Sequence, residues 1–181
     1  VGKSTLFNHL LGKNASIIDD MPGVTRDLHY EDIVYDDKPF TLIDTGGFHI
    51  DEEGDAITTG IRKQIEEIIN SVDGVILLVD GSAGVHPSDK EIFRLIKKHN
   101  VRHWVAVSKI DDQHREGWSY EFYEIGVEAL YTCSGKTGYG TSELLDEVTK
   151  DFWTEREISE KLPPPEEEIK LCVLGRPNVG K

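Results

Sequence analysis

Val1-Gly2-Lys3-Ser4-Thr5-Leu6-Phe7-Asn8 has the pattern of the second half of a phosphate-binding loop (P-loop) that leads into a helix. In such a loop, backbone N–H groups surround a phosphate at the helix N-terminus, the lysine contacts the β- and γ-phosphates, and the hydroxyl binds Mg²⁺. A Gly-Lys-Ser triplet alone is also compatible with an ordinary capped helix start. The candidate nucleotide-binding residues of this stretch are Gly2, Lys3, Ser4 and Thr5.

A second stretch has the same pattern, this time with its first half present. Gly175-Arg176-Pro177-Asn178-Val179-Gly180-Lys181 follows the apolar, strand-like run Leu171-Cys172-Val173-Leu174. The chain is therefore expected to begin inside one P-loop and to end inside another. The candidate phosphate-binding residues of this second P-loop are Gly175, Asn178, Val179, Gly180 and Lys181.

Composition limits the classes of function. The chain has 181 residues, of which 38% are hydrophobic, enough for one well-buried domain and a tail. Its 20 Lys and Arg against 34 Asp and Glu give a net charge of −14, which disfavours binding of DNA or RNA through the phosphate backbone. No apolar run is long enough to span a membrane. Cys133 and Cys172 lie in apolar runs, are expected to be buried thiols, and fit a cytoplasmic protein.

Alternation of strand and helix patterns predicts an α/β fold with a doubly wound, mostly parallel sheet. The predicted strands are 29–35, 40–44, 74–80, 104–108 and 129–133, of which the first two form an antiparallel hairpin. The predicted helices are 3–11, ending at Gly12, then 57–69, 89–100 and 141–152, with a less regular helical stretch reaching residue 123.

The predicted organisation has three parts. Residues 1–154 form a first nucleotide-binding domain that lacks its first strand and the front half of its P-loop. Residues 155–168, rich in acidic side chains and containing Pro163-Pro164-Pro165, form a linker. Residues 169–181 supply the first strand and P-loop of a second domain.

In a doubly wound sheet, functional residues gather beyond the carboxyl ends of the strands. Asp44 ends an apolar strand and is a candidate Mg²⁺ ligand together with Ser4, while Gly46-Gly47 allows a backbone N–H to approach the γ-phosphate. Thr25, in the preceding loop, is a candidate second hydroxyl ligand of Mg²⁺.

A second group of residues is suited to base recognition. Lys109 offers an aliphatic stem to cover a purine, and the carboxylate of Asp111 can accept two N–H groups. Guanine presents such a pair and adenine does not, so the arrangement favours GTP over ATP. Ser134-Gly135-Lys136 offers a backbone N–H for the guanine carbonyl.

Taken in order, these motifs resemble those of the Era-like group of translation-factor-related GTPases. They are Gly-Lys-Ser at 2–4, Pro-Gly-Val-Thr-Arg-Asp at 22–27, Asp-Thr-Gly-Gly at 44–47, Ser-Lys-Ile-Asp at 108–111 and Ser-Gly-Lys at 134–136. The second P-loop after an acidic linker is similar to the Der (EngA) family of tandem-domain GTPases. The resemblance implies GTP and GDP binding, GTP hydrolysis, Mg²⁺, stimulation by K⁺, and a role in assembly of the large ribosomal subunit.

The resemblance also identifies departures from the family pattern. Ser108 stands where the family usually has Asn, which is expected to cost a bond to the base or P-loop. Gly135 stands where Ala is usual, which is expected to cost little. Phe48 follows Gly47 where a water-orienting Gln stands in Ras-like proteins. Lys3, Thr25 and Gly47 then remain as the catalytic candidates, with K⁺ held partly by the P-loop Asn, which corresponds to Asn178.

Alternatives remain open. The chain is also compatible with a nucleotide-sensing interaction module that has little turnover, or with a related tRNA-modification GTPase. The segment 169–181 has the strand that residues 1–154 lack, so it is expected to insert into that sheet, to insert into a neighbouring chain, or to remain a tail.

Overall fold

The computed structural model describes residues 2–14, 29–45, 59–153 and 169–175. Within them the chain forms α-helices, β-strands and one long 3₁₀-helix, η1. In chain order these are α1 (Lys3–Asn14), β1 (His29–Tyr35), β2 (Lys38–Asp44), α2 (Thr59–Ile69), β3 (Gly74–Asp80), α3 (Pro87–His99), β4 (Arg102–Ser108), η1 (Gln113–Ile125), β5 (Tyr131–Thr132), α4 (Thr141–Lys150) and β6 (Lys170–Leu174).

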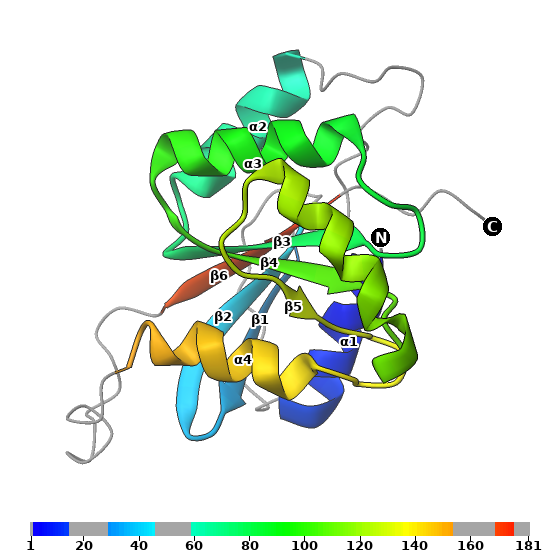
Figure 1. Ribbon diagram of the computed structural model, residues 1–181. Helices are drawn as coiled ribbons and strands as arrows, with labels where there is room; N and C mark the ends of the chain where they lie inside the picture. The colour runs from blue at the N-terminus through cyan, green and yellow to red at the C-terminus, as the bar shows by residue number, and fades with distance from the viewer. Residues whose placement is uncertain (1, 15–28, 46–58, 154–168, 176–181) are drawn as a thin grey trace.

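The strands form one mixed sheet in the order β1-β2-β6-β3-β4-β5. Only the pair β1–β2 is antiparallel, and all other neighbours are parallel. Helices α2 and α3 lie on one side of this sheet and α1 and α4 on the other (Figure 1). The prediction of a doubly wound, mostly parallel sheet is therefore confirmed.

Alternating side chains of the central strands supply the two halves of the core. Val75, Leu77 and Val79 of β3 pack in a cluster with the apolar faces of α2 and α3. Ile76 and Leu78, the intervening residues, pack in a second cluster with α1 and α4. Because successive side chains of a strand point to opposite faces, a strand buried on both sides has to be apolar throughout, as this one is.

The β1–β2 hairpin begins the sheet at one edge. Asp36 and Asp37 link the strands and both have positive φ angles, 52° and 59°. Two positive angles in a two-residue turn match the right-handed twist of the paired strands, and Asp tolerates this conformation better than most residues. The turn leaves Asp44, the last residue of β2, at the carboxyl end of the parallel strands.

The strand near the C-terminus lies in the middle of the sheet. β6 pairs in parallel with β2 on one side, where Leu171 is opposite Leu42, and with β3 on the other, where Leu171 is opposite Gly74. Four successive residues of β6 are buried, from Leu171 to Leu174. Of the three alternatives for this segment, the structure shows insertion into the sheet of the same chain.

Some boundaries differ from those predicted. Helix α1 continues through Gly12 to Asn14, and β5 is reduced to Tyr131–Thr132. The irregular stretch after β4 forms a 3₁₀-helix. Cys133 and Cys172 are buried free cysteines, as predicted, and burial raises the pKa of both thiols.

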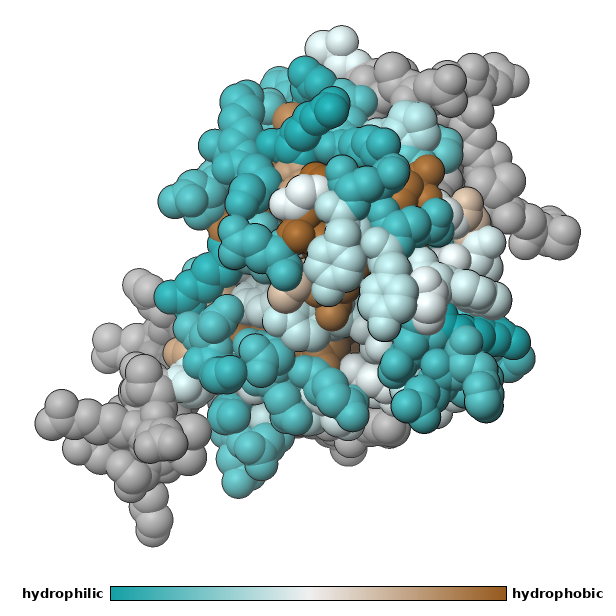
Figure 2. Space-filling model, in the orientation of Figure 1, coloured by the Kyte–Doolittle hydropathy of each residue, from teal (hydrophilic) through white to brown (hydrophobic). Residues whose placement is uncertain are grey.

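The surface is polar on the face shown in Figure 2. Hydrophilic side chains cover its helices, and hydrophobic atoms are visible mainly in the furrows between them. Among the described residues, no helix is both long and apolar enough to cross a membrane. In the described part of the chain, the exposed aromatic side chains are Tyr30 of β1 and three residues of η1, namely Trp118, Tyr120 and Tyr123.

Candidate nucleotide-binding site

Lys3 lies in the first turn of α1, directly beside the end of β6. Its side chain is almost fully buried, and its Nζ donates a hydrogen bond of 2.5 Å to the carbonyl oxygen of Gly175. Gly2 precedes the helix with a φ of +92°, a conformation that suits glycine. The two P-loop-like segments of the sequence therefore meet at one place in the fold.

Burial lowers the pKa of the Lys3 ammonium group, and the nearby carboxylate of Asp44 acts in the opposite direction. Among the described residues, the hydrogen bond to Gly175 and the nearby charge of Asp44 offset only part of the cost of burying this ammonium group, because its pKa is still lowered. An anion bound beside it would compensate this charge, which is the electrostatic role expected of a P-loop lysine.

Asp44 and Ser4 form the second part of the site. The Oγ of Ser4 donates to Oδ2 of Asp44 over 3.1 Å. Asp44 is buried, and its Oδ1 has no hydrogen-bond partner among the described residues. A hydroxyl and a carboxylate in contact, with one buried carboxylate oxygen unpaired, fit the hard oxygen ligands that Mg²⁺ prefers.

Thr45 fixes the end of β2 against β6. Its Oγ1 donates a hydrogen bond of 2.7 Å to the carbonyl oxygen of Val173, and the residue is buried. Asp44 itself lies opposite Val173 in the parallel pairing of the two strands. The strand β6 thus positions Asp44 as well as Lys3.

Asp80 and Lys109 form an ion pair at the adjacent ends of β3 and β4. Lys109 Nζ lies 2.6 Å from Asp80 Oδ2. Burial opposes ionisation of Asp80, but hydrogen bonds from Lys109 and Ser82 outweigh it and lower the pKa of the carboxyl group. The pair holds the lysine stem across the strand ends, where it was predicted to cover a purine.

Ser108 is buried, and its hydroxyl bonds to the neighbouring strand rather than toward the base. Its Oγ donates to the carbonyl oxygen of Val79 over 2.7 Å, so the hydroxyl ties β4 to β3. Lys109, the next residue, has a φ of +64°, which turns the chain at the strand end.

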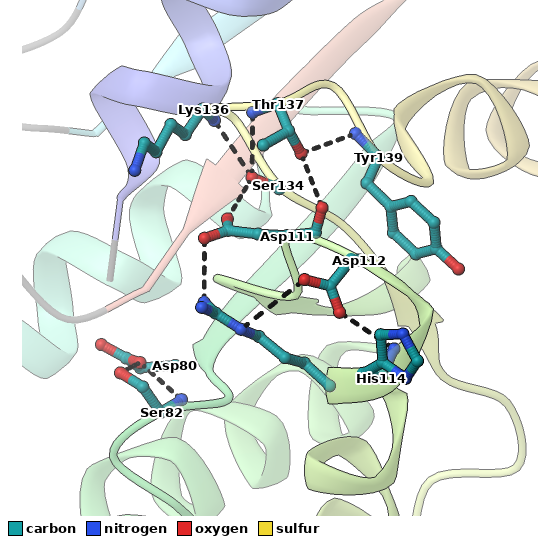
Figure 3. A network of polar contacts seen from close by, with 10 residues as sticks. Asp80, Ser82, Asp111, Asp112, His114, Ser134, Lys136, Thr137 and Tyr139 are labelled. Atoms are coloured by element: carbon teal, nitrogen blue, oxygen red, sulfur yellow. Dashed lines mark hydrogen bonds and ion pairs between the residues drawn. The ribbon is translucent and has the colours of Figure 1, made fainter.

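Asp111 lies beside the loop that follows β5. The Oγ of Ser134 donates a hydrogen bond of 2.7 Å to Oδ1 of Asp111, and Figure 3 shows this pair within a wider network of polar contacts. The Ser134 hydroxyl also accepts hydrogen bonds from the backbone N–H groups of Lys136 and Thr137. Ser134 therefore fixes the carboxylate predicted to recognise the base.

Gly135 connects this loop to α1. A Cβ atom at position 135 would lie 2.5 Å from the backbone nitrogen of Leu6 and 2.7 Å from its Cα. Backbone atoms cannot move aside easily, so alanine would not fit at this position without a shift of α1. The expectation that glycine in place of alanine costs little in base recognition stays a prediction. The close contact brings the base-recognition loop and the first turns of α1 together.

Several predicted site residues lie outside the described part of the chain. They are Thr25, Gly47, Asn178, Val179, Gly180 and Lys181, and Phe48 lies outside it as well. Thr5 is described, with an exposed side chain in the first turn of α1. Roles for the residues outside the described part stay predictions.

The structure also identifies site residues that the sequence did not. Asp80 ends an apolar strand just as Asp44 does, and this signal was available. The contact of Arg115 with Asp111 was harder to find, because Arg115 belongs to η1, whose sequence has no clear periodicity. The side-chain role of Ser134 depends on a contact between two loops and has no local signature.

Comparison with known proteins gives a consistent picture. Residues 1–109 match the model of a family described as 50S ribosome-binding GTPase. The whole chain is 42% identical to part of the GTPase Der of Persephonella marina and 42% identical to part of the GTPase Der of Clostridium acetobutylicum. The chain spans 41% and 40% of the length of these two relatives.

Solved structures agree on the fold. A crystal structure of Era in complex with MgGDPNP and nucleotides 1506–1542 of 16S ribosomal RNA superposes with a TM-score of 0.64 at 25% identity, covering 92% of this chain and 57% of Era. A probable GTP-binding protein engB gives a TM-score of 0.60 at 24% identity and covers 83% of this chain and 92% of its own.

Proposed function

The chain belongs to the family of 50S ribosome-binding GTPases, and on this premise we propose that it binds and hydrolyses GTP as part of a switch protein in assembly of the large ribosomal subunit. One observation carries the proposal most directly. Lys3, Asp44 and the neighbouring pair Lys109 and Asp111 come from three separate segments. Contacts through Ser4, Asp80, Ser134 and Gly135 bring these segments together at the carboxyl end of one sheet.

The phosphates would lie at the end of β6 and the start of α1. Lys3 contributes positive charge to the β- and γ-phosphates, and backbone N–H groups at the helix start provide further donors. Ser4 and Asp44 would hold Mg²⁺, with Thr25 as a further candidate ligand. When bound, Mg²⁺ supplies positive charge that offsets the negative charge on the reacting phosphate oxygens.

The guanine base would lie over the Lys109 stem with its donor edge toward Asp111. The N–H groups of Ser134 and Lys136 already donate to Tyr139 O and to Ser134 Oγ. Within the motif of residues 134–136, this leaves the Gly135 N–H to donate to the guanine carbonyl. Adenine would present no matching pair of donors and would leave the carboxylate unpaired.

The catalytic step relies on charge and on alignment of water rather than on a covalent protein intermediate. Lys3 stabilises charge that develops on the phosphates, and the Gly47 N–H is proposed to contact the γ-phosphate. K⁺ is the proposed activator, held partly by a P-loop Asn such as Asn178. Phe48 carries no group able to orient the attacking water.

We further propose the domain arrangement and the setting in which the protein acts. By sequence, residues 1–154 are assigned to a first GTPase domain, 155–168 to a linker and 169–181 to the start of a second GTPase domain. In the fold of this chain the strand β6 of that last segment lies between β2 and β3 of the first domain's sheet. The family description supports a ribosomal partner, and the Era relative was crystallised with ribosomal RNA. Two buried, free cysteines support the cytoplasm as the location.

Single-turnover hydrolysis tests the proposed activity. Excess protein is mixed with γ-³²P-GTP and Mg²⁺, in K⁺ and in Na⁺, and released phosphate is followed for the natural chain and for Lys3→Ala. The proposal expects release from GTP that is faster in K⁺ and is lost in the variant. Tight binding of GTP without phosphate release would instead support a nucleotide-sensing module.

A further inference from the structure

The carboxylate proposed to recognise guanine has two side-chain partners, Ser134 and Arg115. Arg115 Nη1 donates a hydrogen bond of 2.9 Å to Oδ2 of Asp111, while Ser134 occupies Oδ1. Arg115 lies four residues after Asp111, near the start of η1. Both oxygens of the base-recognition carboxylate are therefore hydrogen-bonded to side chains of the protein itself.

The chemistry of the two competing groups is closely similar. Guanine presents N1–H and a 2-amino group on a carbon bonded to three nitrogens, which is the same guanidine unit that ends an arginine side chain. Both offer parallel N–H donors that match the two oxygens of a carboxylate. Arg115 thus presents to Asp111 the type of donor that guanine would present.

The surroundings indicate which guanine donor Arg115 replaces. Ser134 and Gly135 belong to the loop proposed to contact the guanine carbonyl, and on the purine that carbonyl is next to N1–H. Oδ1 of Asp111, bonded to Ser134, is thus the oxygen nearer to N1–H. Oδ2, bonded to Arg115, is then the oxygen for the 2-amino group.

Arg115 has other partners available when it leaves Asp111. Its Nε is 4.0 Å from Oδ2 of Asp112, and its guanidinium carbon is 5.3 Å from the centre of the Trp118 ring. An arginine over an aromatic face beside a carboxylate retains a favourable environment for its charge. When Arg115 moves away from Asp111, its positive charge therefore still has Asp112 and the Trp118 ring as partners.

From this arrangement we propose that Arg115 competes with the 2-amino group of guanine for Asp111 and so lowers the preference of the site for guanine over hypoxanthine. Arg115 occupies the oxygen of Asp111 that would accept a hydrogen bond from the 2-amino group of guanine, and guanine binding displaces it toward Asp112 and Trp118. This inference rests on the proposed function, since it assumes that Asp111 binds the base. The side chains of Arg115 and Asp111 are 41% and 22% exposed, so the pair is partly solvated and its displacement costs only a few-fold in affinity.

Comparison of two nucleotides isolates this effect. Inosine diphosphate retains N1–H but lacks the 2-amino group, so it can bind while Arg115 remains on Oδ2. Calorimetry in Mg²⁺ would measure the affinities of GDP and inosine diphosphate for the natural chain and for Arg115→Met, which keeps the apolar stem and removes the donors. The matched control is Arg62→Met, which removes the same charge from an exposed ion pair with Glu91 between α2 and α3.

The proposal expects Arg115→Met to raise the ratio of GDP affinity to inosine diphosphate affinity by about two- to fivefold, with the ratio unchanged in Arg62→Met. Loss of a positive charge weakens the binding of both nucleotides alike, so by itself it does not alter the ratio of their affinities. An unchanged or lowered ratio in Arg115→Met, with GDP still preferred to ADP, would overturn the role of Arg115 alone. Equal affinity for GDP and ADP in the natural chain would overturn the proposed function as well.

Discussion

Truncation of Leu171 to alanine should strongly destabilise the fold, because β6 is the central strand of the sheet. Leu171 is fully buried, lies between Leu42 and Gly74 in the strand pairing, and belongs to the core cluster beneath α1 and α4. One of its methyl carbons lies so near Gly74 that a Cβ there would meet it at 2.9 Å. The side chain fills space that no neighbour can readily take over.

The size of the effect follows from this burial. Leu→Ala at fully buried sites costs about 3–5 kcal/mol, the sum of lost transfer free energy and of the cavity that remains. The free energy of unfolding of an ordinary domain is about 5–15 kcal/mol. The variant should therefore lose a large share of its stability. The matched comparison is Lys170→Ala, because Lys170 is exposed on the same strand.

Urea unfolding followed by circular dichroism measures the difference. We expect a loss of about 3 kcal/mol or more for Leu171→Ala and less than about 0.5 kcal/mol for Lys170→Ala. Midpoints that do not change with protein concentration would support insertion within one chain, since an exchanged dimer would unfold in a concentration-dependent way. A Leu171→Ala variant as stable as the natural chain would refute the central position of β6.

Three further predictions concern the site. Lys3→Ala should abolish detectable GDP binding in calorimetry yet keep the circular dichroism spectrum, because its charge serves the phosphates; normal affinity would remove Lys3 from the site. Gly135→Ala should lower the unfolding free energy by about 1–3 kcal/mol and weaken GDP, because its Cβ would meet the backbone of Leu6; an unaltered melting temperature would contradict that contact. Because the pKa of Asp80 is lowered in the fold, its ionised carboxylate stabilises the protein above the unfolded-state pKa of about 4, and this stabilisation is lost as the pH falls further. Asp80→Asn should therefore show a smaller fall in melting temperature below about pH 4 than the natural chain. Parallel plots of melting temperature against pH for the two proteins would count against the ion pair.

Local patterns were sufficient to predict most elements of this fold. The continuous apolar run of β3 and the alternation of strands with amphipathic helices specify a parallel sheet covered on both faces. The position of β6 was not decidable in the same way. Its sequence predicts a strand, but pairing with β2 and β3, rather than with another chain, depends on contacts across nearly the whole length of the protein.

The site was predictable where each residue follows a strand. Asp44, Lys109 and Asp111 stand at strand ends, and the structure places them at the same edge of the sheet. The contacts of Ser134 and Arg115 with Asp111, and of Gly135 with α1, join segments whose relative placement no local pattern encodes. Their roles become visible only with the tertiary structure.

Discrimination between guanine and adenine nucleotides tests the central claim most directly. Calorimetric titration with GDP, ADP and xanthosine diphosphate in Mg²⁺ compares the natural chain with Asp111→Asn. We expect GDP to bind at least about a hundredfold more tightly than ADP, because adenine leaves the Asp111 carboxylate unpaired. The variant should lose affinity for GDP and gain it for xanthosine diphosphate. Equal affinity of the natural chain for GDP and ADP would contradict the assignment of Asp111 to base recognition.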